Sequence, residues 1–414
     1  MSLTLSLTQE SPDGDSNDYF GSGVAMSEDG TRMIVGAKGD QNNDIGQCHI
    51  YHYSGGSWSL EASIHKGIGS ENDLEFGFSV AMNANGDRVA VGAPDSTDTS
   101  TSAKDRVYIY SRSGTSWSLT QTIVGNTGEV GKQFGYSVAM SGDGNVLLIG
   151  IPGYSSNKGC VRSFLWQGSY YGNFNNRFTG PASSAYVGRN IAINYDGSHA
   201  IIPIPAYQTI DRKGRVHLLS IGLQYGNFSN EKTLTGSSND DHLGVGVSIN
   251  KDGDKALIGQ QGSGGTNRGS VFYYTRSGTT WTQRQEITAS DAADGDRFCM
   301  PIISGDGTCA YVANKDGKVY KLSLSGTTWS ESGSVSYSST IGSSATERAQ
   351  LAISEDGTTF ALGSETAGVS NQGQVFVYSV QYEVEEATMS IASLPDGQSI
   401  PDPSSFLFLD ESGP

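Results

Sequence analysis

Residues 134–152 read "FGYSVAMSGDGNVLLIGIP". Two short segments of small and apolar residues flank a turn that ends at Gly144. A glycine at that point tolerates the positive φ that a short hairpin requires, and the preceding Asp143 can hydrogen-bond the local backbone. The stretch therefore predicts a hairpin of two antiparallel strands.

The same hairpin recurs along the chain. Its turn ends at Gly30, Gly86, Gly144, Gly197, Gly253, Gly307 and Gly357, so there are seven copies separated by 50 to 58 residues. A fixed period of this length is the signature of a repeat architecture in which each unit is one small sheet.

Each unit continues in a constant order. The second unit contains "FGFSVAMN", "DRVAVGAP", "RVYIYSRS" and "SWSLTQTIVG", which predict four strands and leave no room for a helix. Trp58, Trp117, Trp281 and Trp329 occupy one repeat position in the last hairpin, whereas units three and four carry "YYGNFNN" and "QYGNFSN" there. We interpret the Trp row as packing between units, with a sugar-binding platform as the alternative.

The two ends of the chain predict a closed ring. The seventh unit has a third strand, "GQVFVYS", but no fourth, while residues 2–9, "SLTLSLTQ", resemble the fourth strand of the second unit. A ring closed by this segment has no free sheet edge, whereas a linear solenoid would have two. We therefore predict a seven-bladed β-propeller over residues 1–380, with four antiparallel strands per blade and the N-terminal strand completing the last blade.

The motifs resemble the FG-GAP repeat family, whose best-known member is the integrin α-subunit propeller. Phe20-Gly21, Phe76-Gly77 and Phe134-Gly135 carry the first element, and Gly92-Ala93-Pro94 carries the second in full. The segment "ITASDAADGDRF", residues 287–298, is similar to the bacterial, protist and viral branch of the family. The resemblance implies a propeller that recognises other molecules.

Integrin-type blades often bind calcium through several acids in the loop between the first and second strands. This chain departs from that pattern, since Ala25, Ser27 and Met33 stand at the ligand positions around Asp29. Calcium requires six to eight oxygen ligands, so one carboxylate per loop is too few. We expect no cofactor and no metal site, although calcium in another loop stays open.

The longer loops of a propeller join the fourth strand to the next first strand and the second strand to the third. These loops share one face, here called the loop face, and the short turns share the other, here called the turn face. Long loops on a rigid ring are the usual place for recognition. The candidate binding residues are Asp13, Asp15, Asp18, Asp40, Asp95, Asp98, Asp240, Asp241, Asp291, Asp294 and Asp296. The alternative interpretation is that these acids are solvated turn residues.

No catalytic pattern is complete in the sequence. "GFSVA" and "GYSVA" superficially resemble a nucleophile elbow, but Ser79 and Ser137 are predicted inside strands rather than at a strand-to-helix turn. We therefore expect no enzymatic activity. The alternative is a hydrolase or lyase that acts on polysaccharide from a loop-face pocket, which would need two carboxylates roughly 5–10 Å apart.

The composition of the chain limits the kinds of partner that it is expected to bind. The 414 residues carry a net charge of −17, which disfavours nucleic acid and anionic membrane surfaces. No apolar run is long enough to insert into a membrane, no signal peptide is recognisable, and the four Cys are not expected to pair. Synthesis inside the cell, followed by incorporation into a particle or surface structure, is favoured.

Residues 381–414 differ from the repeats. They contain no Lys or Arg and end near an apolar cluster, Phe406, Leu407, Phe408 and Leu409. We expect this tail to dock on its own propeller, a neighbouring subunit or a further domain.

The function expected from the sequence is a non-enzymatic binding or structural module that presents its loop face to a protein or a glycan, as an adhesin or as a peripheral subunit of an assembly such as a virus particle.

Overall fold

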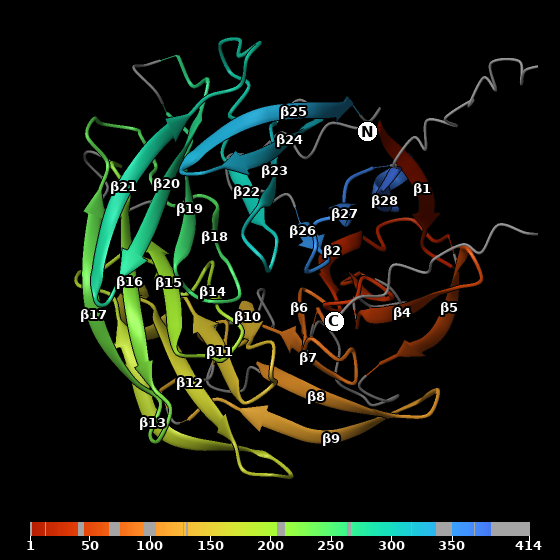
Figure 1. The fold of residues 1–414 in the computed structure, drawn as a ribbon. Coiled ribbons are helices and arrows are strands. Elements are labelled where there is room, and N and C mark those ends of the chain that lie inside the picture. Colours follow the sequence, from red (N-terminus) through yellow and green to blue (C-terminus); the bar gives the residue numbers. More distant parts are fainter. Residues whose placement is uncertain are drawn as a thin grey trace, which may run out of the picture.

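The structure of the chain is a computed structural model. It describes residues 2–12, 14–39, 45–65, 75–94, 105–126, 128–129, 131–204, 212–262, 266–315, 317–336, 350–367 and 369–381. Seven sheets of four antiparallel strands surround a central axis, as predicted (Figure 1). The last described strand ends at Gln381, and the tail with its predicted docking residues Phe406, Leu407, Phe408 and Leu409 lies outside the described residues.

The blades follow the order of the chain, and their strands are as follows. Blade 1 holds β2 (Phe20–Met26), β3 (Arg32–Ala37), β4 (Gln47–Ser54) and β5 (Ser57–Ile64); blade 2 holds β6 (Ser79–Met82), β7 (Arg88–Ala93), β8 (Arg106–Ser113) and β9 (Ser116–Val124). Blade 3 holds β10 (Ser137–Met140), β11 (Val146–Ile151), β12 (Cys160–Trp166) and β13 (Tyr171–Thr179); blade 4 holds β14 (Ala192–Ile193), β15 (His199–Ile204), β16 (Arg215–Gly222) and β17 (Asn227–Thr235). Blade 5 holds β18 (Val247–Ile249), β19 (Lys255–Gln260), β20 (Ser270–Ser277) and β21 (Thr280–Ile287); blade 6 holds β22 (Met300–Ile303), β23 (Cys309–Ala313), β24 (Lys318–Ser325) and β25 (Thr328–Ser336). Blade 7 holds β26 (Gln350–Ile353), β27 (Thr359–Ser364), β28 (Gln374–Gln381) and, from the other end of the chain, β1 (Ser2–Glu10).

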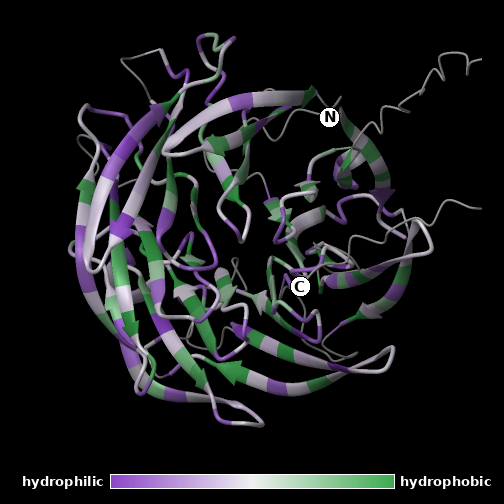
Figure 2. Cartoon of the chain, in the orientation of Figure 1, coloured by the Kyte–Doolittle hydropathy of each residue, from purple (hydrophilic) through white to green (hydrophobic). Residues whose placement is uncertain are grey.

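The core lies between neighbouring blades. Every residue of β11 is buried, because its sheet is covered on both sides, whereas β9 at the rim is mostly exposed. Figure 2 shows the same gradient, with apolar segments on the inner strands and polar ones on the outermost strands. One core cluster joins Ala90 and Val107 of blade 2 to Phe134 and Ile149 of blade 3, so each blade boundary is a hydrophobic interface.

The ring closes as predicted. β1 pairs antiparallel with β28, and the register joins Leu5 to Tyr378 and Gln9 to Val375. Strands from opposite ends of the chain therefore form one sheet, which Figure 1 shows beside the label N.

A second ring joins the blades through their turns. One backbone N–H of each turn between first and second strands donates to a carbonyl of the next blade. The seven bonds run from Glu28 to Ala84, Ala84 to Gly142, Asp143 to Tyr195, Tyr195 to Lys251, Lys251 to Gly305, Asp306 to Glu355, and Glu355 back to Glu28, with N···O distances of 2.8 to 3.3 Å. This circle satisfies polar groups of the turns and fixes the spacing of all seven blades.

The glycines of the two signature elements pack against each other across the blade boundaries. A Cβ atom added to Gly92 would lie 2.1 Å from the carbonyl oxygen of Gly135 in the next blade. Gly36 and Gly150 face the carbonyl oxygens of Gly77 and Gly188 in the same way, at 2.0 Å each. Glycine is thus required in the second strand because the backbone of the next blade occupies the space of a side chain.

We expect Gly92→Ala to destabilise the protein by at least about 2 kcal/mol, because backbone atoms must move to admit the methyl group. Gly333→Ala in β25 is the matched control, since a Cβ there meets nothing within 4 Å. Urea unfolding of both variants measures the difference. Equal stability of the two would show that the glycine contact does not constrain the blade boundary.

The described residues are almost entirely strand and turn. The one α-helix among them is the single turn α1 (Tyr154–Asn157), between β11 and β12, in which Ser155 and Ser156 have positive φ. A 3-10 turn, η1 (Val369–Asn371), lies between β27 and β28. The expectation that a blade leaves no room for a helix therefore holds apart from these two loops. No described helix has the length and hydropathy needed to cross a membrane.

Candidate functional site

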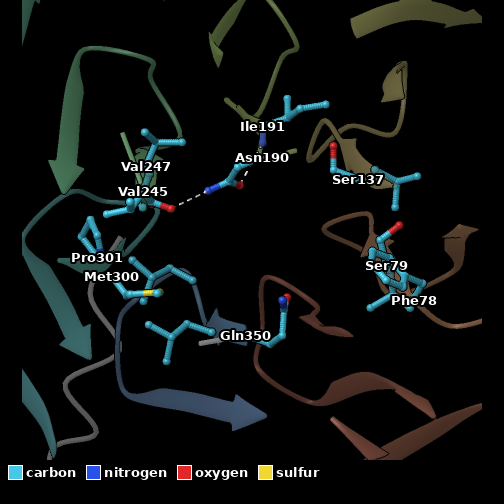
Figure 3. Close-up of a pocket in the computed structure, with 16 residues that line it drawn as sticks. Phe78, Ser79, Ser137, Asn190, Ile191, Val245, Val247, Met300, Pro301 and Gln350 are labelled. Carbon is cyan, nitrogen blue, oxygen red and sulfur yellow. Dashed lines mark hydrogen bonds between the residues drawn. The ribbon is translucent and has the colours of Figure 1, made fainter. Parts of the chain in front are cut away.

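The axis of the propeller holds an open cavity at the loop face, here called the mouth. Its volume is about 250 Å³, and described residues of blades 2 to 7 line it. Figure 3 shows Phe78, Ser79, Ser137, Asn190, Ile191, Val245, Val247, Met300, Pro301 and Gln350 around this space. Its described lining consists of hydroxyl, amide and apolar side chains and includes no charged side chain.

Hydrogen bonds between blades hold the polar side chains of the mouth in place. The Ser79 hydroxyl donates to the Gly135 carbonyl at 2.8 Å, and the Ser137 hydroxyl donates to the Gly188 carbonyl at 2.7 Å. The Asn190 amide nitrogen donates across the cavity wall to the Val245 carbonyl at 3.4 Å (Figure 3). Ser79 and Ser137 therefore belong to the first strands β6 and β10, as predicted, and their hydroxyls also join neighbouring blades.

A cluster of aromatic and charged side chains lies at the edge of the mouth. The Lys38 ammonium forms an ion pair with Glu365 at 2.7 Å and lies 5.2 Å from the centroid of the Phe78 ring. The Phe78 ring packs against Tyr136 with 4.7 Å between centroids, and Lys38 also lies 5.1 Å from the Tyr19 ring. This rim cluster joins blades 7, 1, 2 and 3, so four blades contribute to one surface.

The opposite end of the axis, at the turn face, carries three charged side chains. The Lys251 ammonium donates to the carboxylate of Glu28 and, at 2.6 Å, to that of Glu355, and it lies 4.5 Å from the Tyr195 ring. The hydrogen bonds from its ammonium to Glu28 and Glu355 raise the pKa of Lys251 above its usual value, so the cation is retained at neutral pH. The triad borders a smaller space of about 210 Å³ near the turn face.

The predicted acidic residues do not form one site among the described residues. Asp13, Asp40, Asp95 and Asp98 lie outside the described residues. Asp15 is exposed, whereas Asp18 is 1% exposed. The two therefore differ sharply in their access to solvent.

The two acids before blade 5 have different roles. Asp240 is exposed and pairs with Arg212 at 2.8 Å. Asp241 is 2% exposed and accepts hydrogen bonds from the Ser238 amide at 2.7 Å and the Ser237 hydroxyl at 3.1 Å. Asp241 therefore stabilises its own loop.

The acids before blade 6 also have separate partners. Asp291 accepts from Lys318 at 2.5 Å, and Asp294 accepts from Arg268 at 2.8 Å. Asp296 accepts from the Ala293 amide at 2.6 Å. Each of these three candidate binding residues is therefore engaged with a different donor.

The aspartates of the short turns are also engaged locally. One Asp29 oxygen accepts from the Ser27 hydroxyl at 2.6 Å and the Thr31 amide at 2.9 Å, and the other accepts from the Thr31 hydroxyl at 2.8 Å. The turns at Asp306 and Asp356 repeat this arrangement. Among the described residues, no group of three or more His, Cys, Asp or Glu could hold a metal ion.

The aspartates of these turns make the free energy of unfolding depend on pH. Burial alone would raise the pKa of Asp306, but hydrogen bonds from Ser304 and Thr308 outweigh it, so its pKa lies below the model-peptide value of 3.8. A lowered pKa in the folded state contributes stability that is present above about pH 4 and is lost as the pH falls further. Asp29, Asp196 and Asp356 have lowered pKa values for the same kind of reason.

We expect Asp306→Asn to reduce the loss of stability between about pH 4 and pH 2, because the amide keeps an acceptor oxygen but does not titrate. Urea midpoints at both pH values, compared with those of the unsubstituted chain, measure the change. An unchanged acid dependence would show that this turn does not contribute to it.

The Trp row packs between blades. Trp281 and Trp329 are 3% and 2% exposed, and the Trp117 indole donates to Glu61 of the preceding blade at 2.8 Å.

All four Cys are buried and form no disulfide. Burial raises the pKa of the Cys299 thiol to about 12, so this thiol is unreactive at neutral pH.

The sequence analysis did not identify the mouth or its rim. Phe78 and Tyr136 occupy the same place in "FGFSVAM" and "FGYSVAM", where we assigned the residues only to an inner strand. Large aromatic residues at one repeat position, next to the axis, are the signal that could have revealed the rim cluster. Nothing in the sequence marks Lys38 and Glu365 as neighbours, because their contact depends on closure of the ring.

Comparison with known families agrees with the motifs. Residues 8–51 match the family model described as the FG-GAP repeat, a span that includes β2 and β3 of blade 1. The resemblance expected from Phe20-Gly21 is thereby confirmed in this blade, and the other six blades repeat its architecture. No curated protein matches the chain.

Proposed function

From an FG-GAP β-propeller whose axis carries a polar mouth at the loop face, we propose a non-enzymatic binding module that engages a protein partner with its loop face. The observation that carries the proposal is the build of the mouth. It offers about 250 Å³, and hydrogen bonds between blades hold the polar side chains of Ser79, Ser137 and Asn190 in its wall. A concave site with few, well-placed polar groups is the usual form of a recognition site.

The charges of the loop face suit a protein partner. Asp240, Asp291 and Asp294 pair with basic residues while 58%, 53% and 65% exposed. Exposed pairs contribute little to folding, so these acids can exchange their partners for basic residues of another protein at little cost. The net charge of −17 speeds the approach of a basic partner. We propose that such a module serves at the periphery of an assembly such as a virus particle, or in adhesion. A glycan at the mouth is the second candidate ligand.

The lining of the mouth favours binding over catalysis. Its hydroxyl and amide groups orient a ligand, but they do not exchange protons at neutral pH. The Glu28 and Glu355 carboxylates border the space at the other end of the axis, where both contact Lys251. A polysaccharide hydrolase or lyase would require a free acid–base pair beside its substrate.

Site-specific photo-crosslinking tests the proposal. A photoreactive phenylalanine analogue replaces Phe78 at the mouth or, as a control, Thr279 in the exposed turn between β20 and β21 on the turn face. We expect the probe at Phe78, in extracts of the source organism, to form a covalent adduct with one protein that excess unlabelled chain suppresses. The probe at Thr279 should not form this adduct.

Two results would overturn the proposal. One is the same set of adducts from both positions, or none from Phe78. The other is release of new reducing ends from a polysaccharide by the purified chain, abolished by Asn190→Ala, which would establish the enzymatic alternative.

A further inference from the structure

The hairpins of blades 3 and 4 expose a group of large apolar side chains on the turn face. Tyr170, Phe174, Leu223 and Tyr225, here called the hairpin patch, are 52%, 39%, 51% and 56% exposed. They belong to the two hairpins whose sequences depart from the Trp pattern. An exposed apolar group of this kind, set in a polar rim, marks an interaction surface more often than chance does.

The backbone of blade 3 is shaped so that Phe174 is presented at the surface. In blade 2 the bulge between β8 and β9 inserts one extra residue, between the pairs Ile109–Gln121 and Tyr110–Leu119. In blade 3 the pairs Arg162–Arg177 and Phe164–Asn173 leave three residues of β13 opposite one of β12. Bulges re-aim side chains and recur beside functional sites.

Contacts between the two blades hold the patch in one arrangement. The rings of Phe174 and Tyr225 meet edge to face, with 6.4 Å between centroids and an angle of 72°. The Asn176 amide donates to the Tyr225 carbonyl, and the Ser163 hydroxyl donates to the Gly226 carbonyl at 2.5 Å. The Phe174 and Tyr225 part of the patch is therefore preorganised, and little ordering of these two rings is needed when a ligand binds.

The two hairpin segments that carry the patch contain no charged residue. Residues 167–176 and 221–230 contain no Asp, Glu, Lys or Arg, although the chain as a whole has a net charge of −17. Their polar residues are Gln, Asn and Ser, and Asn173 and Asn227 are exposed beside the rings. Neither segment therefore offers an ion-pair partner to a charged ligand, whereas a neutral ligand needs none and gives up no hydrated charge when it binds.

We propose that the hairpin patch binds neutral carbohydrate. The apolar C–H face of a sugar ring stacks on the exposed rings of Tyr170, Phe174 and Tyr225, and its hydroxyls exchange hydrogen bonds with the neighbouring amides. Leu223 extends the contact along the ligand. Because the patch lies on the turn face, it is separate from the mouth and binds independently of the loop-face partner.

The test uses protein made in bacteria, so that Asn227 of the sequon Asn227-Phe228-Ser229 carries no glycan. An array of neutral, sialylated and sulfated oligosaccharides is probed with the full chain, and saturation-transfer NMR at millimolar sugar follows for each neutral class. We expect binding to neutral oligosaccharides, with contact to aromatic protons. Phe174→Ala and Tyr225→Ala should each weaken it about tenfold.

Two further variants separate sugar binding from folding. Tyr225→Phe keeps the ring and should retain most of the affinity. Leu119→Ala removes an exposed apolar side chain of blade 2, 46% exposed, and should leave binding unchanged. All variants are expected to unfold at the same temperature as the unsubstituted chain, because the altered side chains are exposed.

The proposal is overturned by absence of binding to every neutral class at millimolar concentration, or by binding that Phe174→Ala and Tyr225→Ala leave intact. Binding confined to the charged oligosaccharides would overturn it as well. Loss of sugar binding with retention of the Phe78 adduct would support the separation of the two surfaces.

Discussion

A chain that lacks residues 1–10 is expected to lose its cooperative unfolding transition and to aggregate. β1 supplies the fourth strand of blade 7 and pairs with β28 along its length, while Leu3 and Leu7 pack against the clusters on either side of that blade. Its removal exposes β28 as a free edge and uncovers part of the core. The loss approaches the roughly 5–15 kcal/mol that holds a typical domain together.

Thermal unfolding and light scattering measure this effect. Leu5→Ser is the matched control, because Leu5 lies on the same strand but is 48% exposed and should be nearly neutral. A synthetic peptide of residues 1–10 should restore a cooperative transition by adding the missing strand. A truncated chain that unfolds at the normal temperature without the peptide would contradict the role assigned to β1.

Glu129→Ala is expected to destabilise the protein by about 3–5 kcal/mol, because it leaves the buried charge of Arg162 without its counter-ion. Arg162 in β12 is fully buried and donates to Glu129 at 2.7 Å, and Glu129 also accepts from the Asn126 amide at 2.7 Å. The guanidinium further contacts Asn173 and lies 5.0 Å from the Phe164 ring. This pair fixes the loop before blade 3 to the third strand of that blade.

A double substitution tests the cause. If the penalty comes from an unpaired buried charge, Glu129→Ala combined with Arg162→Met should be more stable than Glu129→Ala alone. Urea unfolding of Glu129→Ala, of Arg162→Met and of the double variant gives the three free energies of unfolding. A double variant that loses the sum of the two single losses would show that the ion pair does not couple the residues.

The fold was predictable because it depends on signals that repeat. Gly30 and its six counterparts mark every turn, and the missing fourth strand after Tyr378 has its complement in residues 2–9. Each signal is local, and seven copies remove the ambiguity that one copy would leave. The family resemblance followed from Phe20-Gly21 for the same reason.

The sites were less predictable, because they depend on which residues meet across blades. Asp294 is a candidate ligand in the sequence, yet Arg268 engages it in the structure. Lys251 looks like an ordinary turn residue, and only ring closure brings Glu28 and Glu355 to it. The exposure of Phe174 depends on an enlarged bulge whose register cannot be counted from the residues alone.

The arrangement of the faces, and with it both proposed surfaces, depends on closure of the ring by β1. The Ser6 and Ser379 hydroxyl oxygens lie 3.5 Å apart, so Ser6→Cys with Ser379→Cys places two thiols within reach of a disulfide. Mild oxidation should link these positions in the monomer, detected as a disulfide-bonded peptide by mass spectrometry, and raise the melting temperature. The pair Ser6→Cys with Ser118→Cys in blade 2 should not link. A chain in which Ser6→Cys and Ser379→Cys stay reduced, or link only between molecules, would contradict the closed ring.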